Sequence, residues 1–282
     1  MNRYSNLYTE EVFSTKNYSK VKGKNEYIGN KDSIGKKHGF GIQQINNGDK
    51  FIGIFSHDKK KGWGELFKAN NEIIKGYYND DKLNGFAEYQ KGKDVTYFGY
   101  WDNDKQNGAG YEIWIDSSNY YGEYKNGKKE GIGIYLWSDK SKYEGEWKDN
   151  NLNGFGIYYF PDGRNYSGEW KNQKMDGYGE FYWIEGRKYC GFYKEDKREG
   201  FGIYYQSNKY IYIGFWKDGQ RSGFAKIIKG ESIKYEIWKN GKKEKVLKDK
   251  EEILDNLKGE KRKYKKIFNL SISGIKELIG KI

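Results

Sequence analysis

Few side chains in this 282-residue sequence are of the types that most often carry out chemistry. There are two histidines, His38 and His57, and a single cysteine, Cys190. A structural zinc site takes four ligands and a catalytic one three, and this small set does not supply a typical His/Cys combination. Nothing local places a nucleophile beside a histidine. We interpret both histidines as turn residues, and we expect no catalytic, metal-binding or cofactor-binding residue.

Two further motifs could suggest ligand sites. Residues 122–129, GEYKNGKK, match the spacing of a phosphate-binding loop, but Lys129 stands where that loop needs Ser or Thr. The carboxylates Glu123, Glu146 and Glu169 recur along the sequence, as a cation-binding ladder would require. Pairing with lysines across strands explains them better. The chain is accordingly predicted not to be an enzyme and to need no cofactor.

The elements that carry these residues repeat along the chain. A unit opens with an aromatic or aliphatic residue, followed two positions later by Gly and four positions later, in most units, by an aromatic residue. The units start at Tyr27, Phe51, Ile74, Tyr97, Tyr120, Tyr143, Tyr166, Tyr189 and Tyr212, and a degenerate tenth unit starts at Tyr235. The residues expected to form the repeat lattice are Tyr97, Gly99, Trp101, Tyr120, Gly122, Tyr124, Tyr143, Gly145, Trp147, Tyr166, Gly168, Trp170, Tyr189, Gly191, Tyr193, Tyr212, Gly214 and Trp216. Nine near-perfect copies indicate architecture rather than an active site.

Each unit is predicted to be a β-hairpin. Residues 143–147, YEGEW, alternate with a period of two, which places Tyr143, Gly145 and Trp147 on one face of a strand. Glycine weakens a strand unless something large approaches it closely. We expect a ring from the neighbouring hairpin to lie flat on each glycine. Because the aromatic residues recur so regularly beside Gly, we expect them to pack with each other and not to bind nucleic acid.

The pattern Y-x-G-x-W, a turn with Lys and Gly, a G-x-G pair and a D-G turn resembles the MORN repeat (membrane occupation and recognition nexus). The resemblance implies an all-β fold: an elongated, single-layer antiparallel meander of repeat β-hairpins with a short α-helical C-terminal tail. The expected domains are an N-terminal extension, residues 1–26, the repeat array, residues 27–241, and a charged helical tail, residues 242–282.

The tail carries half of the net charge of +12 and two groups of apolar residues at helical spacing. The first group runs from Val246 to Leu257, and Gly259 is expected to separate two helices. The candidate contacts for a lipid or a protein partner are Lys261, Arg262, Lys263, Lys265, Lys266, Ile275, Leu278, Ile279 and Ile282. We expect the tail to fold back and cover the end of the sheet.

Two functions remain open at this point. The resemblance implies a non-catalytic scaffold or adaptor that binds protein partners, in a ciliary (radial-spoke-like) or cytoskeletal assembly. The alternative is a peripheral module that binds the anionic phospholipids of a membrane through the repeats and the basic C-terminal helix. Unpaired sheet ends also leave homo-oligomerisation open. A single cysteine and the lack of an apolar N-terminal stretch predict a cytoplasmic protein that is not secreted. The two functions above imply association with the cytoskeleton, a cilium or a membrane.

Overall fold

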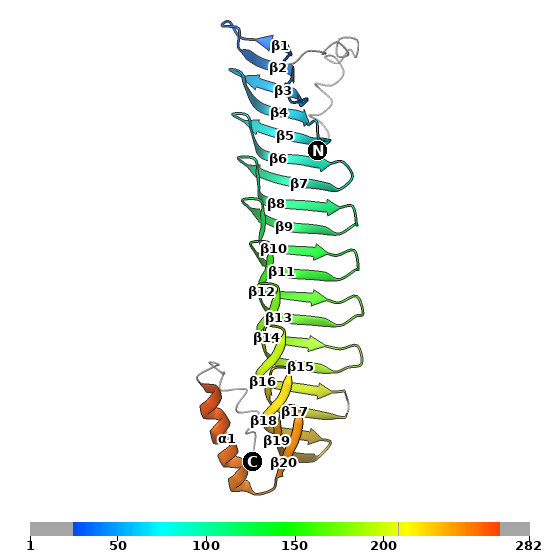
Figure 1. Cartoon of the computed structure of the whole chain (residues 1–282), viewed down its shortest axis with the longest axis vertical. Coiled ribbons are helices and arrows are strands. Elements are labelled where there is room, and N and C mark those ends of the chain that lie inside the picture. Colours follow the sequence, from blue (N-terminus) through cyan, green and yellow to red (C-terminus); the bar gives the residue numbers. More distant parts are fainter. Residues whose placement is uncertain (1–24, 208, 266–282) are drawn as a thin grey trace. The chain divides into compact units, whose positions relative to one another are not determined.

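The computed structural model describes residues 25–207 and 209–265, and these form two compact units (Figure 1). Unit 1 holds the residues up to 117 together with 124–127, and unit 2 holds 118–123 together with the residues from 128 onward. The strands of unit 1 are β1 (Tyr27–Lys31), β2 (Lys37–Gln44), β3 (Lys50–Ser56), β4 (Lys59–Phe67), β5 (Glu72–Asn79), β6 (Lys82–Lys91), β7 (Val95–Asp102) and β8 (Lys105–Trp114). Strand β9 (Asn119–Lys125) is divided between the units.

Unit 2 continues with eleven strands and one helix among its described residues. They are β10 (Lys128–Leu136), β11 (Lys142–Lys148), β12 (Asn151–Tyr159), β13 (Asn165–Lys171), β14 (Lys174–Tyr182), β15 (Lys188–Lys194), β16 (Lys197–Gln206), β17 (Tyr210–Lys217), β18 (Gln220–Lys229), β19 (Ser232–Lys239), β20 (Lys242–Leu247) and α1 (Lys250–Lys265). Within each unit every strand pairs antiparallel with its neighbours in the sequence. The predicted fold class is confirmed: an all-β antiparallel meander of repeat hairpins with a short C-terminal helix.

The turns inside the hairpins explain why the sequence folds back at regular intervals. Two consecutive residues with positive φ, such as His57 (48°) and Asp58 (72°), join β3 to β4. Positive φ at both central residues defines the type I′ turn, which matches the twist of paired strands. The turn between β3 and β4 also bonds to β2 of the preceding hairpin: Lys37 N–H donates to Asp58 Oδ1 at 2.9 Å, and Asp58 N–H donates to Lys37 O at 3.0 Å. The same contact recurs between Lys60 and Asp81.

The front face of each unit, defined here as the face carrying the first tyrosine of each repeat, is a lattice of rings and glycines. Tyr143 is fully buried, and its ring covers Gly145 and Gly156, the glycine opposite on β12. Its hydroxyl donates to Glu146 O at 3.0 Å. Trp147 packs edge-on against the same ring, with centroids 5.5 Å apart. The expectation of a ring from the neighbouring hairpin is therefore wrong, because the tyrosine leans along its own strand onto the glycine two positions ahead.

The C-terminal end differs from the prediction in three ways. Strand β20 extends the sheet to Leu247, past the predicted end of the array at residue 241, because Leu247 pairs with Tyr235. Val246 is therefore also part of a strand and not of a helix. Helix α1 runs through Gly259, where we expected a break between two helices. A single glycine in a helix costs only about 1 kcal/mol, so it need not end one.

The tenth hairpin is shifted by one residue. Glu236 lies opposite Ala225, in the place where a glycine faces a glycine in the earlier units. Tyr235 consequently points to the other face of the sheet, the back face, and stacks on Phe224 with centroids 5.8 Å apart. The degenerate tenth unit therefore begins with a tyrosine on the opposite face from the first tyrosines of the earlier units, because a slip of one residue turns a strand's side chains over.

Candidate functional site

The front tyrosines are closed off from ligands. Tyr97, Tyr120, Tyr143, Tyr166, Tyr189 and Tyr212, which belong to the expected repeat lattice, are all fully buried. Cations lie over the rings of this face: Arg198 sits 3.9 Å from the ring centroid of Trp216, and Lys60 sits 5.2 Å from that of Phe51. Burial lowers the pKa of both cationic groups. This lattice is therefore the core of the sheet rather than an open groove.

The back face of unit 1 is different, because its aromatic side chains are exposed. Trp63 on β4 lies opposite Tyr77 on β5, and Phe86 on β6 lies opposite Tyr100 on β7. The rings of each pair meet edge-on, with centroids 5.3 Å and 5.8 Å apart. The four residues expose 44%, 51%, 44% and 52% of their surface, in that order. We call these four residues the back aromatic patch.

At the same register position in unit 2, the Tyr178–Phe192 pair stays partly exposed, but a second aromatic pair is covered. Phe201 on β16 lies opposite Phe215 on β17, with centroids 5.8 Å apart, yet the two residues expose only 6% and 5% of their surface. Ile253 of α1 packs into their cluster, together with Phe224 and Leu247. The back face of this sheet thus offers cross-strand aromatic pairs on which an amphipathic helix can lie.

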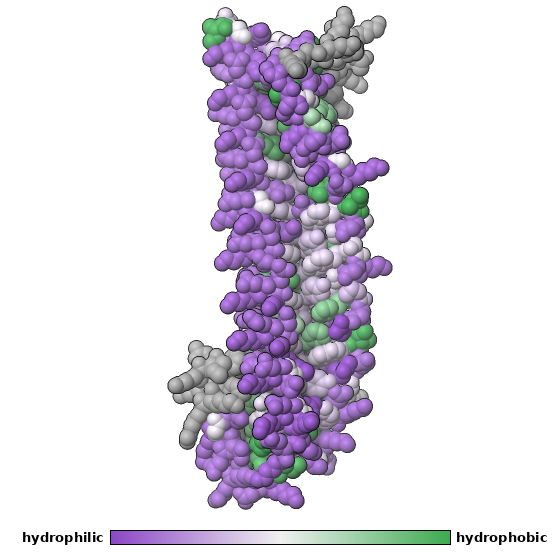
Figure 2. Space-filling view, in the orientation of Figure 1, coloured by the Kyte–Doolittle hydropathy of each residue, from purple (hydrophilic) through white to green (hydrophobic). Residues whose placement is uncertain are grey.

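Figure 2 shows where apolar surface is scarce. Hydrophilic residues cover most of the side it presents, and a pale band of residues with intermediate hydropathy runs beside them. The mean hydropathy of the chain is −1.08, and a surface of this kind keeps exposed apolar area small. Other large apolar residues such as Tyr121, Ile132 and Phe155 are exposed as well, but in the back aromatic patch exposed rings meet in two pairs on neighbouring strands, and a patch of this kind indicates binding.

The expected carboxylate column has a role that the sequence did not indicate. Glu146 Oε1 accepts the N–H of Phe155 at 2.8 Å, and Glu169 Oε1 accepts the N–H of Tyr178 at the same distance. The carboxylate of Glu146 lies over Gly154, whose φ of 78° accompanies the irregularity in the pairing of β11 with β12. The prediction that these residues pair with lysines across strands is wrong for Glu146 and Glu169. Each carboxylate instead accepts a hydrogen bond from a backbone N–H, a group that is costly to leave without a partner.

Cys190 shows no sign of activation as a nucleophile. Burial raises the pKa of its thiol to about 11, and the negative charge of Glu180 adds to the effect. A reactive cysteine needs the opposite shift. Its neighbour Lys188 is engaged by Glu180 at 2.9 Å.

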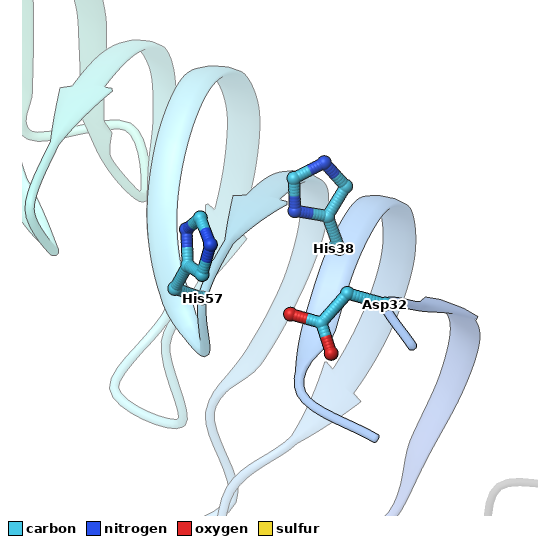
Figure 3. A group of neighbouring side chains, drawn as sticks. All are labelled: Asp32, His38 and His57. Atoms are coloured by element: carbon cyan, nitrogen blue, oxygen red, sulfur yellow. The ribbon is translucent and has the colours of Figure 1, made fainter. Parts of the chain in front are cut away.

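The two histidines, which the sequence placed in separate turns, lie together with Asp32. The ring centroids of His38 and His57 are 5.6 Å apart, and one ligand atom from each of the three residues lies within 4.8 Å of the others. Figure 3 shows the three side chains around one space: Asp32 comes from the turn before β2, His38 from the start of β2 and His57 from the turn between β3 and β4. Sequence reasoning missed this group because it treated the histidines as isolated. The signal was available, since the repeat register sets each hairpin turn beside the preceding hairpin.

The candidate contacts of the tail fall partly outside the described residues. Lys261, Arg262, Lys263 and Lys265 belong to α1, whereas Lys266, Ile275, Leu278, Ile279 and Ile282 lie outside the described part of the chain. The part that is described contains no helix with the length and apolar composition needed to cross a bilayer.

Comparison with known proteins gives a family. The family model of the MORN repeat matches residues 33–50, 97–118, 120–142, 143–163, 166–186, 189–209 and 212–229, which together make up just over half of the chain. The units that start at Phe51 and Ile74 lie outside these matches, although they form the same hairpins. Among curated proteins, none matches the sequence.

Three solved structures show a weak likeness. They are the TCP domain of SAS-4 from Drosophila melanogaster in complex with a proline-rich motif of Ana2 (14% identity, 59% of this chain and 96% of that chain covered, TM-score 0.35), the TCP10 domain of CPAP from Danio rerio (10%, 78% and 94%, 0.35) and the TCP10c domain of Sas-4 from Drosophila melanogaster (15%, 60% and 99%, 0.33). These TM-scores are too low to support any conclusion about this chain.

Proposed function

Because the chain belongs to the MORN-repeat family, we propose that it is a non-catalytic scaffold that binds a protein partner through the back aromatic patch. One observation carries the proposal: the Phe201–Phe215 pair is buried under α1, whereas the matching Trp63–Tyr77 and Phe86–Tyr100 pairs of unit 1 are exposed. The helix that the chain places on its own sheet is a guide to what the exposed pairs recognise.

The size of the patch agrees with this role. An aromatic side chain buries about 150–250 Å² when it is fully covered, so four half-exposed ones offer roughly 400 Å² of accessible surface. Patches of a few hundred Å² mark interaction sites on soluble domains. Ile54 on β3, also exposed, extends the apolar surface by one strand.

The partner that fits is an amphipathic helix with apolar residues at i, i+3 or i+4, and i+7. A helix of this kind lays one apolar stripe into a shallow surface and leaves its polar face in water. Neighbouring strands are about 4.8 Å apart, so one helix of three to four turns spans β4 to β7. Aromatic side chains are the residues that most often dominate binding energy at such surfaces.

A photo-crosslinking experiment tests the proposal. The unnatural amino acid p-benzoylphenylalanine replaces Tyr100 in the full-length chain, and after capture from the source cells mass spectrometry identifies the crosslinked segment. We expect an apolar stripe of helical period, and we expect the Trp63→Ser/Phe86→Ser variant to lose most of the capture. The matched control is Tyr121→Ser, since Tyr121 is exposed but lies outside the patch.

The alternative partner, an anionic membrane, is tested with the patch variant, its control and a third variant in the C-terminal helix. Flotation with vesicles that contain phosphatidylserine measures membrane binding without any protein partner. Capture that is equal in the patch variant and in the control contradicts the scaffold proposal. Vesicle binding that is lost on replacing Lys261 and Lys263 by Glu then supports the membrane function instead.

The setting of the partner is part of the proposal. We propose the cytoplasm, and within it a cytoskeletal or ciliary assembly, on the family resemblance alone. Fluorescence microscopy of the tagged full-length chain tests this directly, and a diffuse signal that the patch variant does not change would contradict it.

A further inference from the structure

We propose that Asp32, His38 and His57 form a binding site for a divalent transition-metal ion of the Zn²⁺ class in the first two hairpins of unit 1. The site is independent of the back aromatic patch. Imidazole nitrogens with one carboxylate oxygen are a ligand set that suits zinc, copper and nickel, and three protein ligands leave one coordination position for water.

The backbone brings the two histidines together. Lys37 and Asp58 exchange two hydrogen bonds, from Lys37 N–H to Asp58 Oδ1 at 2.9 Å and from Asp58 N–H to Lys37 O at 3.0 Å. His38 follows one of these residues and His57 precedes the other, so the contact between the hairpins sets their side chains side by side. Lys37 itself turns its ammonium to the front face, 5.0 Å from the ring centroid of Phe55, which keeps its charge away from the histidines.

The same two positions carry other pairs in later repeats, and these pairs are built for hydrogen bonding. Glu130 Oε2 accepts the N–H of Asp149 at 3.0 Å, and Glu199 Oε2 accepts the N–H of Asp218 at 2.9 Å. Both positions are histidine only in the first pair, and the chain has no other histidine. In the first pair, two imidazole rings therefore stand where the later pairs place a carboxylate beside a backbone N–H.

Asp32 reaches the histidines because the first hairpin turn is longer than the others. Gly29 and Gly39 are ten positions apart, whereas Gly53 and Gly62, the corresponding glycines of the next unit, are nine apart. The added residue lets Asp32 lead a turn in which its Oδ1 accepts the N–H of both Ile34 and Lys36, at 3.1 Å and 2.9 Å. Both bonds go to Oδ1 and hold the carboxylate in place, and Oδ2, which takes part in neither bond, can bind an ion.

The geometry is close to what a metal requires. Ligand atoms bonded to tetrahedral zinc at about 2.0–2.1 Å lie roughly 3.4 Å from one another. The three ligand atoms here lie within 4.8 Å of one another, so small rotations of the side chains close the set, and both histidine side chains are exposed enough to rotate. Ser56 Oγ lies 3.1 Å from His57 Nδ1. A histidine that binds a metal usually donates its other ring N–H to a neighbouring acceptor, which fixes its tautomer. If Nδ1–H of His57 donates to the Ser56 hydroxyl, Nε2 keeps the lone pair that a metal needs.

The ion would add a link between two successive hairpins that hydrogen bonds already join. It would link the turn between β1 and β2 to the turn between β3 and β4, and β1 pairs only with β2 among the described strands. A ligand that binds the folded state stabilises it by mass action, so the first hairpins should melt at a higher temperature when the ion is present.

Calorimetric titration of the full-length chain with ZnCl₂, after purification without a histidine tag, tests the proposal. We expect one zinc site per chain. We expect His38→Asn and His57→Asn each to raise the Kd for zinc by at least about tenfold, because losing even a residue that only hydrogen-bonds to a metal ligand often has an effect of this size. Asparagine tolerates positive φ, as at His57 (48°), and it stands at the same turn position in a later hairpin as Asn103 (48°). Asparagine also stands at the position of His38 in a later unit, as Asn84, so both variants should fold. Co²⁺ absorption in the visible range gives an independent signal that reports the coordination number.

Two comparisons make the result decisive. Asp162→Asn is the control for Asp32→Asn, because Asp162 Oδ1 likewise accepts the N–H of the residue two positions ahead, Arg164, in a turn that contains no histidine. We expect only Asp32→Asn to weaken zinc binding. No heat of binding at millimolar zinc, or a Kd unchanged in both histidine variants, would overturn the proposal.

Discussion

Replacing the second glycine of a G-x-G pair by alanine should unfold the lattice locally, and the cost should disappear when the covering ring is removed as well. A Cβ on Gly156 would lie 2.5 Å from Cε2 of Tyr143, and closer still to its hydroxyl. The ring cannot retreat without losing its burial and its hydrogen bond to Glu146 O. Overpacking of this kind costs about 1–3 kcal/mol.

The chain itself supplies the compensating variant. In the unit that starts at Ile74, which has no ring at this position, the second glycine is replaced by Ala87, and the alanine is fully buried. The unit that starts at Tyr212 combines a ring with Ala225, but there the pairing of β17 with β18 shifts directly after Gly214, so its backbone differs from that around Gly156. Tyr143→Ile alone should cost about 2–4 kcal/mol, since it leaves a cavity where a buried ring was. The double variant Tyr143→Ile/Gly156→Ala should be more stable than the sum of the two single effects by about 1–2 kcal/mol.

Urea unfolding, followed by circular dichroism and by tryptophan fluorescence, measures the four corners of this cycle. The control is Gly259→Ala in α1, where nothing lies within 4 Å of the added Cβ, and it should stabilise the helix by up to about 1 kcal/mol. Strict additivity of the two lattice changes would refute the argument that the ring requires the glycine.

Two further predictions concern unit 2. Ile253→Ala should lower the free energy of unfolding by about 2 kcal/mol or more, because it removes the buried contact of α1 with Phe215, whereas Lys258→Ala, on the exposed side of the helix, should have little effect in the same urea titration. With a pKa raised to about 11 by burial, the Cys190 thiol should be alkylated by iodoacetamide at pH 8 roughly 100-fold more slowly than a free cysteine, and the rate should rise with pH until the thiol titrates near 11. A rate like that of a free thiol would contradict the burial.

Much of the fold follows from the sequence, because the unit is short and its constraints are local. Alternation of Tyr143, Gly145 and Trp147 requires a strand with one buried face. Consecutive turn residues that tolerate positive φ require a tight hairpin, and a period of 23 residues then repeats the hairpin along the chain. These rules act over a few residues, so no knowledge of distant contacts was needed to apply them.

The features that only the tertiary structure decided depend on which residues of different hairpins become neighbours. The sequence did not show that Tyr143 covers the glycines of its own hairpin, since an alternating pattern gives the face of a side chain but not the direction in which it leans. It did not show that Ile253 covers one aromatic pair while others stay exposed, because exposure depends on what packs above a strand. It also treated His38 and His57 as separate residues. Their approach depends on hydrogen bonds between successive hairpins, and a contact of that kind is set by register in space rather than by spacing in the sequence.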